Sequence, residues 1–229
     1  MKIYYDNIIY SLQNAGGISS YWSEISKRLV LANIEVSFYG YQNENIFMKN
    51  LDFNIKSETS IYFKICRYLD FRKKLPSNSI FHSSYYRISN QKDIINITTV
   101  HDFTYEYFKN GFSKLVHTYQ KSRAINKSDG IICVSKNTKE DLLKFYPHLE
   151  EDKITVIYHG VNDAFCKLDD SKFCLNKLFN ELDDKKYILY VGERTSYKNF
   201  DILAEVVNET SDYVLVIVGG KNLTNKEKN

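Results

Sequence analysis

Arg194 and Lys198 are the two residues whose types and spacing most directly suggest a chemical role. They follow the apolar run Tyr187–Val191, and Gly192 separates that run from the two cations. An unbroken apolar run is typical of a strand buried on both faces, and a helical repeat of apolar residues begins at Phe200. Cations placed between such a strand and a helix N-terminus are suited to binding phosphate groups. The alternative is a solvated Arg and Lys beside an ordinary strand–helix turn.

His101 and Asp102 form a second candidate, because they directly follow the β-branched run Asn96–Val100. Open α/β sheets bind ligands at the carboxyl ends of their strands, where His101 is able to hydrogen-bond a sugar hydroxyl or a phosphate. The alternative is a histidine whose hydrogen bonds are made by neighbouring backbone. The other histidines considered lack this context, and we expect structural roles for them: His82, His117 and His148.

Gly16 and Gly17 separate a first strand, Lys2–Tyr5, from a helix whose apolar face includes Ile18 and Leu29. Two glycines there permit close approach of a ligand to backbone amides. A Gly-Gly pair alone is a weak signal, and the alternative is a plain tight turn. The pattern is not GxGxxG, so a dinucleotide-binding dehydrogenase is disfavoured.

Ser135 follows the buried run Gly130–Val134 and lacks the GxSxG context of a hydrolase nucleophile. Asn137 and Glu140 are spaced as a capping box for the next helix, which Pro147 terminates.

The candidate residues named so far lie between predicted strands and helices that alternate along the chain. This alternation predicts an α/β fold with a Rossmann-like, doubly wound parallel sheet. Basic and aromatic residues predict an amphipathic helix over 61–75, which either packs on the domain or contacts an anionic membrane surface. The remaining predicted strands are Glu35–Tyr39, Ser79–Ser83, Ile154–Ile157 and Tyr213–Val218, and a further helix is predicted over Ser113–Lys127.

Composition narrows the class of protein further. The 229 residues are 43% hydrophobic and 26% charged, as is ordinary for a folded protein. The net charge of +3 is too small to produce a broad positive potential that would attract nucleic acid. The four cysteines form no CxxC pair, and no histidine pair has metal-ligand spacing, so we expect reduced thiols and no metal. No signal peptide or transmembrane run is visible, and a cytoplasmic protein is expected.

Six segments, in this order, resemble the retaining glycosyltransferases of GT-B architecture often called family 4. They are Gly16–Ile18, Thr99–Asp102, Ser128–Ser135, Lys153–Val161, Val191–Arg194 with Lys198 and Asn199, and Val216–Gly220. The resemblance implies an acceptor-binding lobe over 1–165, a connection over 166–185, and the start of a nucleotide-sugar-binding lobe over 186–229.

The resemblance also implies roles for individual residues. Arg194 and Lys198 would hold the donor diphosphate and stabilise the leaving nucleotide, and His101 would contact the transferred sugar. Asp102 would orient the loop, and the remaining substrate-binding residues would be Gly16, Gly17, Ser135 and Gly192. The resemblance implies neither a cofactor nor a metal. The donor would be a GDP- or UDP-linked hexose, and the acceptor would be a glycan or a lipid-linked carrier. The process would be the synthesis of bacterial surface polysaccharide at the inner face of the membrane.

The family also places two glutamates eight positions apart later in its second lobe, and Glu227 in the polar tail is assignable to neither. We therefore expect a truncated chain, an interrupted gene product or one piece of a split enzyme. The rival to an active transferase is a non-catalytic acceptor-binding lobe that needs a partner chain.

Overall fold

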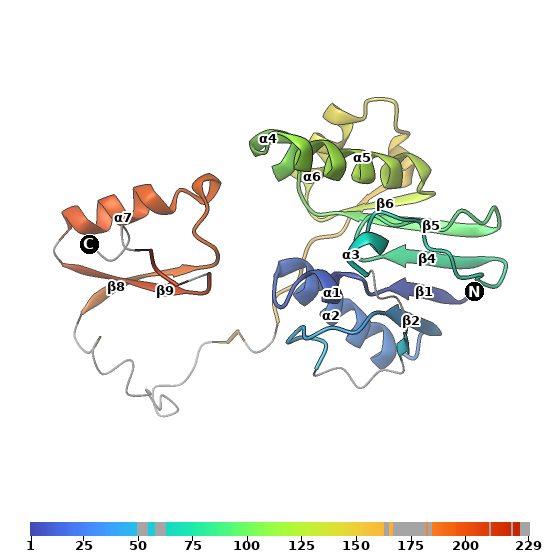
Figure 1. Cartoon of the computed structure of the whole chain (residues 1–229), viewed down its shortest axis with the longest axis horizontal. Helices are drawn as coiled ribbons and strands as arrows, with labels where there is room; N and C mark the ends of the chain where they lie inside the picture. Colours follow the sequence, from blue (N-terminus) through green and yellow to red (C-terminus); the bar gives the residue numbers. More distant parts are fainter. Residues whose placement is uncertain are drawn as a thin grey trace. The chain divides into compact units, whose positions relative to one another are not determined.

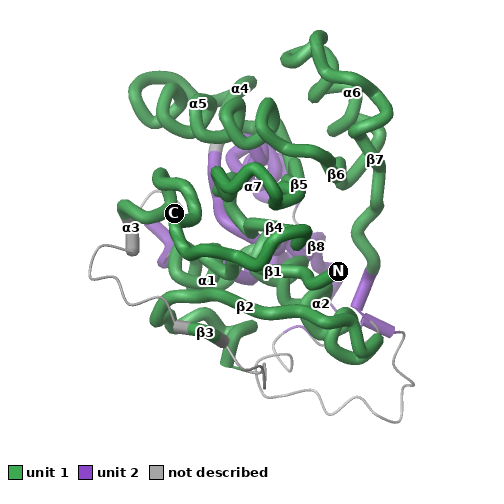
Figure 2. The backbone as a smooth tube through the Cα atoms, turned by 90° about the vertical axis from the view of Figure 1, so that its right-hand side faces the viewer, with its two compact units in different colours: residues 1–160 green, residues 161–229 purple. Residues whose placement is uncertain are grey.

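The computed structural model describes residues 1–49, 55–57, 63–162, 165–166, 182, 185–210, 212–220 and 222–224. It divides into two compact units, Met1–Gly160 and Val161–Asn229 (Figures 1 and 2). The predicted connection over 166–185 lies mostly outside the described residues, as does Glu227.

Unit 1 is built on a parallel sheet whose seven described strands run in the order β3-β2-β1-β4-β5-β6-β7. The chain starts at β1, moves outward to β2 and β3, returns to β4 and then continues outward in the other direction. This is the doubly wound, Rossmann-like arrangement that the sequence predicts, and strand order reverses between β1 and β4. The strands are β1 Ile3–Asp6, β2 Val36–Gly40, β3 Ile55–Ser57, β4 Ser79–Ser83, β5 Ile94–Val100, β6 Gly130–Cys133 and β7 Ile154–Val156.

Alternating side chains of these strands enter two separate cores, one on each face of the sheet. Tyr5 and Phe38 point to the face covered by α1 (Ile9–Leu12) and α2 (Gly17–Leu31), where they surround the fully buried Trp22. Tyr4 and its register partner Phe81 point to the opposite face. Because neighbouring residues of a strand face opposite ways, one short strand contributes to both cores.

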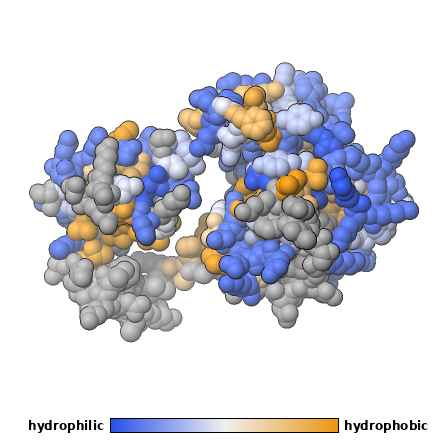
Figure 3. Space-filling view, in the orientation of Figure 1, coloured by the Kyte–Doolittle hydropathy of each residue, from blue (hydrophilic) through white to orange (hydrophobic). Residues whose placement is uncertain are grey.

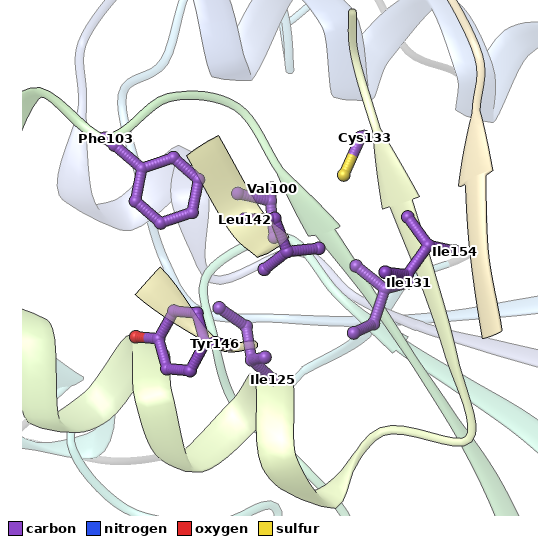
Figure 4. Packing of buried hydrophobic residues seen from close by; sticks show 8 residues of the cluster. All are labelled: Val100, Phe103, Ile125, Ile131, Cys133, Leu142, Tyr146 and Ile154. Carbon is purple, nitrogen blue, oxygen red and sulfur yellow. The ribbon is translucent and has the colours of Figure 1, made fainter. Parts of the chain in front are cut away.

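The second face is covered beside β5–β7 by α5 (Phe112–Lys127) and α6 (Lys136–Phe145). Figure 4 shows the packing between these helices and the strands. All eight side chains of this cluster are buried: Val100, Phe103, Ile125, Ile131, Cys133, Leu142, Tyr146 and Ile154. Burial of each large apolar side chain contributes about 1.5–3 kcal/mol, so this cluster holds both helices to the sheet.

The amphipathic helix predicted over 61–75 is wrong beyond its first turns. The described helix there, α3, covers only Phe63–Cys66, and residues 61–62 lie outside the description. Downstream, Phe71 pairs with Ser89 and Leu75 is 2% exposed, so both side chains enter the sheet core. The Gln91 amide also hydrogen-bonds the backbone N–H and carbonyl of Leu75. These long-range contacts outweigh the local helical pattern.

Unit 2 contains the parallel pair β8 (Lys186–Val191) and β9 (Tyr213–Val218), joined through the 3-10 turn η4 (Ser196–Lys198) and α7 (Phe200–Glu209). α7 covers one face, where Phe200 is 4% exposed and contacts Tyr190. The predicted burial of β8 on both faces is wrong: Tyr187, Leu189 and Val191 are each more than half exposed. The described part of unit 2 has no second layer over that face, where hydrophobic side chains gather (Figure 3).

Candidate functional site

The first group of candidate residues lies where the parallel strands of unit 1 end. α2 begins at Gly17 with Gly16 as its N-cap, directly beyond β1 and α1. A Cβ on Gly16 would collide with Gln13 Oε1, whereas a Cβ on Gly17 would meet only open space. Gly16 therefore permits a close packing contact, and Gly17 leaves the helix N-terminus accessible. The binding role of both glycines stays a prediction.

His101 lies among aromatic rings from two other elements. Its ring is 5.1 Å from that of Tyr21 on α2, edge-on, and 5.8 Å from that of His159, which follows β7. The Tyr21 and His159 rings are 4.5 Å apart. No role was predicted for Tyr21 or His159, since nothing local in the sequence indicates that α2 brings Tyr21, and the segment after β7 brings His159, to His101.

Burial keeps His101 uncharged near neutrality. Burial above all, together with the neighbouring His159 and Lys121, lowers the pKa of His101 to about 4, against the opposing effect of Asp102. Neutral His101 is thus a hydrogen-bonding group rather than a cation at pH 7.

His82 has the structural role that the sequence analysis expected. It is 4% exposed, and its Nε2 lies 2.9 Å from Thr99 Oγ1. Its ring packs between Tyr5 and Trp22, and burial lowers its pKa to about 3.

A buried ion pair supports the backbone beside His101. Lys121 of α5 is fully buried, and its Nζ donates to the carbonyl of Asp102 at 2.5 Å. The same Nζ lies 3.1 Å from Glu106 on α4 (Thr104–Phe108). Asp102 itself is exposed, and its Oδ1 accepts a hydrogen bond from Thr104 N. These contacts link the residue after His101 to α4 and α5, and a loop-orienting role of Asp102 stays a prediction. Lys121 was missed because a lysine on a helix is normally read as solvated.

Ser135 is the N-cap of α6. Its Oγ accepts from Thr138 N at 3.0 Å and lies 2.9 Å from Thr138 Oγ1. The expected capping box at Asn137 and Glu140 is therefore wrong, because the helix begins two residues earlier. Substrate binding by Ser135 stays a prediction.

Mutation of Ser135 tests its contribution as the N-cap of α6. Ser135→Ala removes the acceptor for Thr138 N and should lower the free energy of unfolding by about 1 kcal/mol. Urea denaturation checks this, with Ser135→Asp, which retains a capping oxygen, as the control. Equal stability of Ser135→Ala and wild type would contradict a capping contribution.

In unit 2, the second group of candidates lies at the carboxyl ends of β8 and β9. Gly192 and Gly220 adopt φ of 130° and 78°, which side-chain-bearing residues rarely adopt. A Cβ on Gly192 would lie 3.3 Å from Lys198 Nζ, and one on Gly220 would lie 3.1 Å from Arg194 Nη1. The structure thus brings Gly192, Arg194 and Lys198 together beside Gly219 and Gly220.

Hydrogen bonds fix the arginine more firmly than the lysine. Arg194 Nη1 lies 3.5 Å from the Gly219 carbonyl, and Nη2 donates to the Asn222 carbonyl at 3.2 Å. The exposed Lys198 has no ion-pair partner within the described part of the chain. Two cationic side chains beside backbone that contains glycines with positive φ can bind a group with two negative charges, such as a diphosphate. Sequence analysis assigned Gly219 and Gly220 no binding role.

The lowered pKa of His101 predicts that the stability of the fold depends on pH. His101 has a folded pKa below its unfolded value of about 6.5, so it binds fewer protons when folded. Its contribution to stability is complete above that pH and is lost as the pH falls towards 4. We expect wild-type Tm to fall between pH 6.5 and 5, and His101→Gln to reduce that slope with little change of Tm at pH 7.5. Thermal denaturation across this range checks the expectation, and identical slopes would contradict it.

The described residues contain no cluster of three or more His, Cys, Asp or Glu side chains placed to hold a metal ion. None of their helices combines the length and apolar character that crossing a bilayer requires.

The fold of unit 1 and the glycine-and-cation edge of unit 2 define a Rossmann-like α/β protein. The profile of Glycosyltransferase Family 4 matches residues 15–165, more than half of the chain. The chain therefore belongs to Glycosyltransferase Family 4. No curated protein matches it.

Solved structures show the same fold at low sequence identity. Anabaena HepE in complex with UDP-glucose is 13% identical, with a TM-score of 0.66 over 99% of this chain and 63% of HepE. A mutant of S. aureus TarM, in complex with fondaparinux, α-GlcNAc-glycerol and UDP, is 12% identical, with a TM-score of 0.63 over 100% of this chain and 74% of TarM. The chain thus spans less than two-thirds of the length of HepE.

Proposed function

We propose that this chain belongs to a retaining glycosyltransferase that moves a hexose from a nucleoside-diphosphate sugar to a glycan or lipid-linked acceptor. The observation that carries the proposal is the edge of unit 2, where Arg194 and Lys198 face Gly192 and Gly220. Negative charge grows on the leaving diphosphate during transfer, and fixed cations beside it stabilise that charge.

The residues of unit 1 have complementary roles in the proposal. Neutral His101 hydrogen-bonds the transferred sugar, while Asp102 and the ion-paired Lys121 hold its loop. Gly16 and Gly17 at the start of α2, and Ser135 at the start of α6, contribute to substrate binding. The donor is UDP- or GDP-linked, and no metal takes part. The UDP-glucose and UDP named in the HepE and TarM complexes support a UDP-linked donor. The process is bacterial surface polysaccharide synthesis at the cytoplasmic face of the membrane.

A second candidate function is an acceptor-binding lobe without turnover. The family profile matches residues 15–165, which lie almost entirely in unit 1, and this favours the alternative.

Nucleotide titration tests the proposal. We expect UDP or GDP, raised to millimolar concentration, to increase Tm of the full chain, with ADP as the comparison. A ligand that binds only the folded state adds about 2.7 kcal/mol of stability at a hundredfold excess over Kd. A response to UDP or GDP supports donor binding. Cooperative melting with no response to any nucleotide would leave the acceptor-binding alternative.

A further inference from the structure

An open cavity of about 660 Å³ lies in unit 1 along the flank of α5, between this helix and the segment after α3. Cavities of about 300–1,000 Å³ hold drug-sized ligands, which are comparable in size with a di- or trisaccharide. The cavity lies on the α5 face of the sheet, whereas His101 and Tyr21 lie on the α2 face. None of the site residues considered above lines it.

The walls of the cavity combine exposed aromatic rings with a fixed polar group. Tyr119 is 72% exposed and Tyr68 is 48% exposed, and both line it. Asp70 receives hydrogen bonds from both terminal nitrogens of Arg123 and from the side-chain amide of Asn90. Burial opposes ionisation of Asp70, but the hydrogen bonds from Arg123 and Asn90 outweigh it and lower the pKa of the carboxyl. A charged, oriented carboxylate thus lies beside two aromatic rings.

A smaller cavity of about 140 Å³ continues from the first and shares Tyr68, Tyr119 and Arg123 with it. Gln120 lines this continuation and is 8% exposed, and its Oε1 has no hydrogen-bond partner among the described residues. A buried amide oxygen without a donor is costly, and a bound hydroxyl would satisfy it.

Aromatic rings lead from this continuation towards the carboxyl ends of the strands. Tyr86, which lines it, packs edge-on against His117 at 5.7 Å, and His117 stacks on Tyr105 at 3.8 Å. Tyr105 lies in α4, three residues beyond Asp102. Tyr86 has φ of 49°, which is uncommon for a bulky residue and characteristic of ligand clamps and active sites.

We propose that this cavity binds a neutral oligosaccharide, as a site for the part of the acceptor distant from the transferred sugar. Sugar rings present apolar C–H faces, which pack on aromatic rings, and hydroxyls, which hydrogen-bond planar carboxylate, amide and guanidinium groups. The cavity supplies both kinds of contact. The inference rests on the proposed transferase function, since it assigns the acceptor class of that reaction.

The test measures saccharide binding to the full chain by saturation-transfer NMR and tyrosine fluorescence. The probes are cellopentaose, maltopentaose and chitopentaose. At least one should bind saturably below 10 mM. Tyr119→Ala and Asp70→Asn should each raise Kd at least tenfold, while Tyr119→Phe, which retains the ring, should stay within twofold of wild type. The matched control is Phe112→Ala, because Phe112 is an 80% exposed ring on the same helix outside both cavities.

The outcomes separate this inference from the proposed function. Saccharide binding without any nucleotide response would support the cavity and reject the transferase assignment. A nucleotide response with no saccharide binding, or with binding unchanged in Tyr119→Ala, would overturn the cavity alone. A third outcome would also overturn the saccharide site: no saccharide binds, but the chain binds phosphatidylglycerol vesicles, and both Phe112→Ala and Tyr119→Ala weaken that binding. The exposed rings of α5 would then contact a lipid surface.

Discussion

Lys198→Ala is expected to weaken binding of UDP or GDP to the full chain by 10- to 100-fold. A hydrogen bond to a charged group contributes about 1.5–3 kcal/mol, and Lys198 has no ion-pair partner among the described residues that would compete for it. Isothermal titration with each nucleotide measures the change. Arg194→Ala should have a comparable effect, although it also removes the contacts of Arg194 with the Gly219 and Asn222 carbonyls.

Lys186→Ala is the matched control for this experiment. Lys186 is exposed and lies at the opposite end of β8 from Gly192. Its substitution removes one positive charge from the same unit, as Lys198→Ala does, but leaves the candidate diphosphate site unchanged. We expect its nucleotide affinity to equal that of wild type. If all three variants lose affinity equally, the effect is a general field rather than a diphosphate site. Wild-type affinity in both Lys198→Ala and Arg194→Ala would remove the assignment.

Two strands of this protein were predictable from continuous apolar runs, which are typical of parallel strands. Gly130–Val134 was expected and β6 covers Gly130–Cys133, and Tyr213–Val218 matches β9. The strand–helix–strand unit of β1, α2 and β2 was predicted as well, since parallel strands are joined by right-handed crossovers. By contrast, no helix lies in the described segment between β4 and β5, so the pattern of alternating strands and helices does not hold there. The apolar pattern alone did not show that one face of β8 is exposed.

Elements whose conformation depends on distant contacts were not predictable in this way. The segment after α3 carries a helical pattern, but Phe71 and Leu75 pack on the sheet and Gln91 binds the backbone of Leu75. Likewise, no local signal joins Lys121 to Glu106, because the two residues lie on different helices. Residue types at strand ends indicated where the site lies, whereas the contacts that orient it required the structure.

The largest effect on stability is expected at the buried pair of Asp6 and Arg87. Asp6 is fully buried at the end of β1, and Arg87 is 4% exposed in the loop after β4. Arg87 Nη1 lies 3.1 Å from both carboxylate oxygens, and Ser83 Oγ donates to Oδ2 at 2.8 Å. Arg87 Nε also donates to the Leu69 carbonyl. One ion pair therefore joins β1, the loop after β4 and the segment that leads into the cavity.

Arg87→Met should lower the free energy of unfolding by about 3–5 kcal/mol, because it leaves the Asp6 carboxylate buried without its counter-charge. The fluorescence of Trp22, the single tryptophan of the chain, reports the unfolding of unit 1 in urea because this side chain is fully buried in its core. The double variant Asp6→Asn with Arg87→Met should recover part of the loss, since it removes the unpaired charge as well.

Comparison of the single and double variants separates two reasons for keeping a buried ion pair. If the double variant regains wild-type stability, the pair adds no net stability, and its function is to fix the relative positions of β1 and the loop after β4. If it remains as unstable as Arg87→Met, the hydrogen bonds of Arg87 to the Asp6 carboxylate and to Leu69 stabilise unit 1 directly. Wild-type stability in Arg87→Met itself would contradict the buried pair.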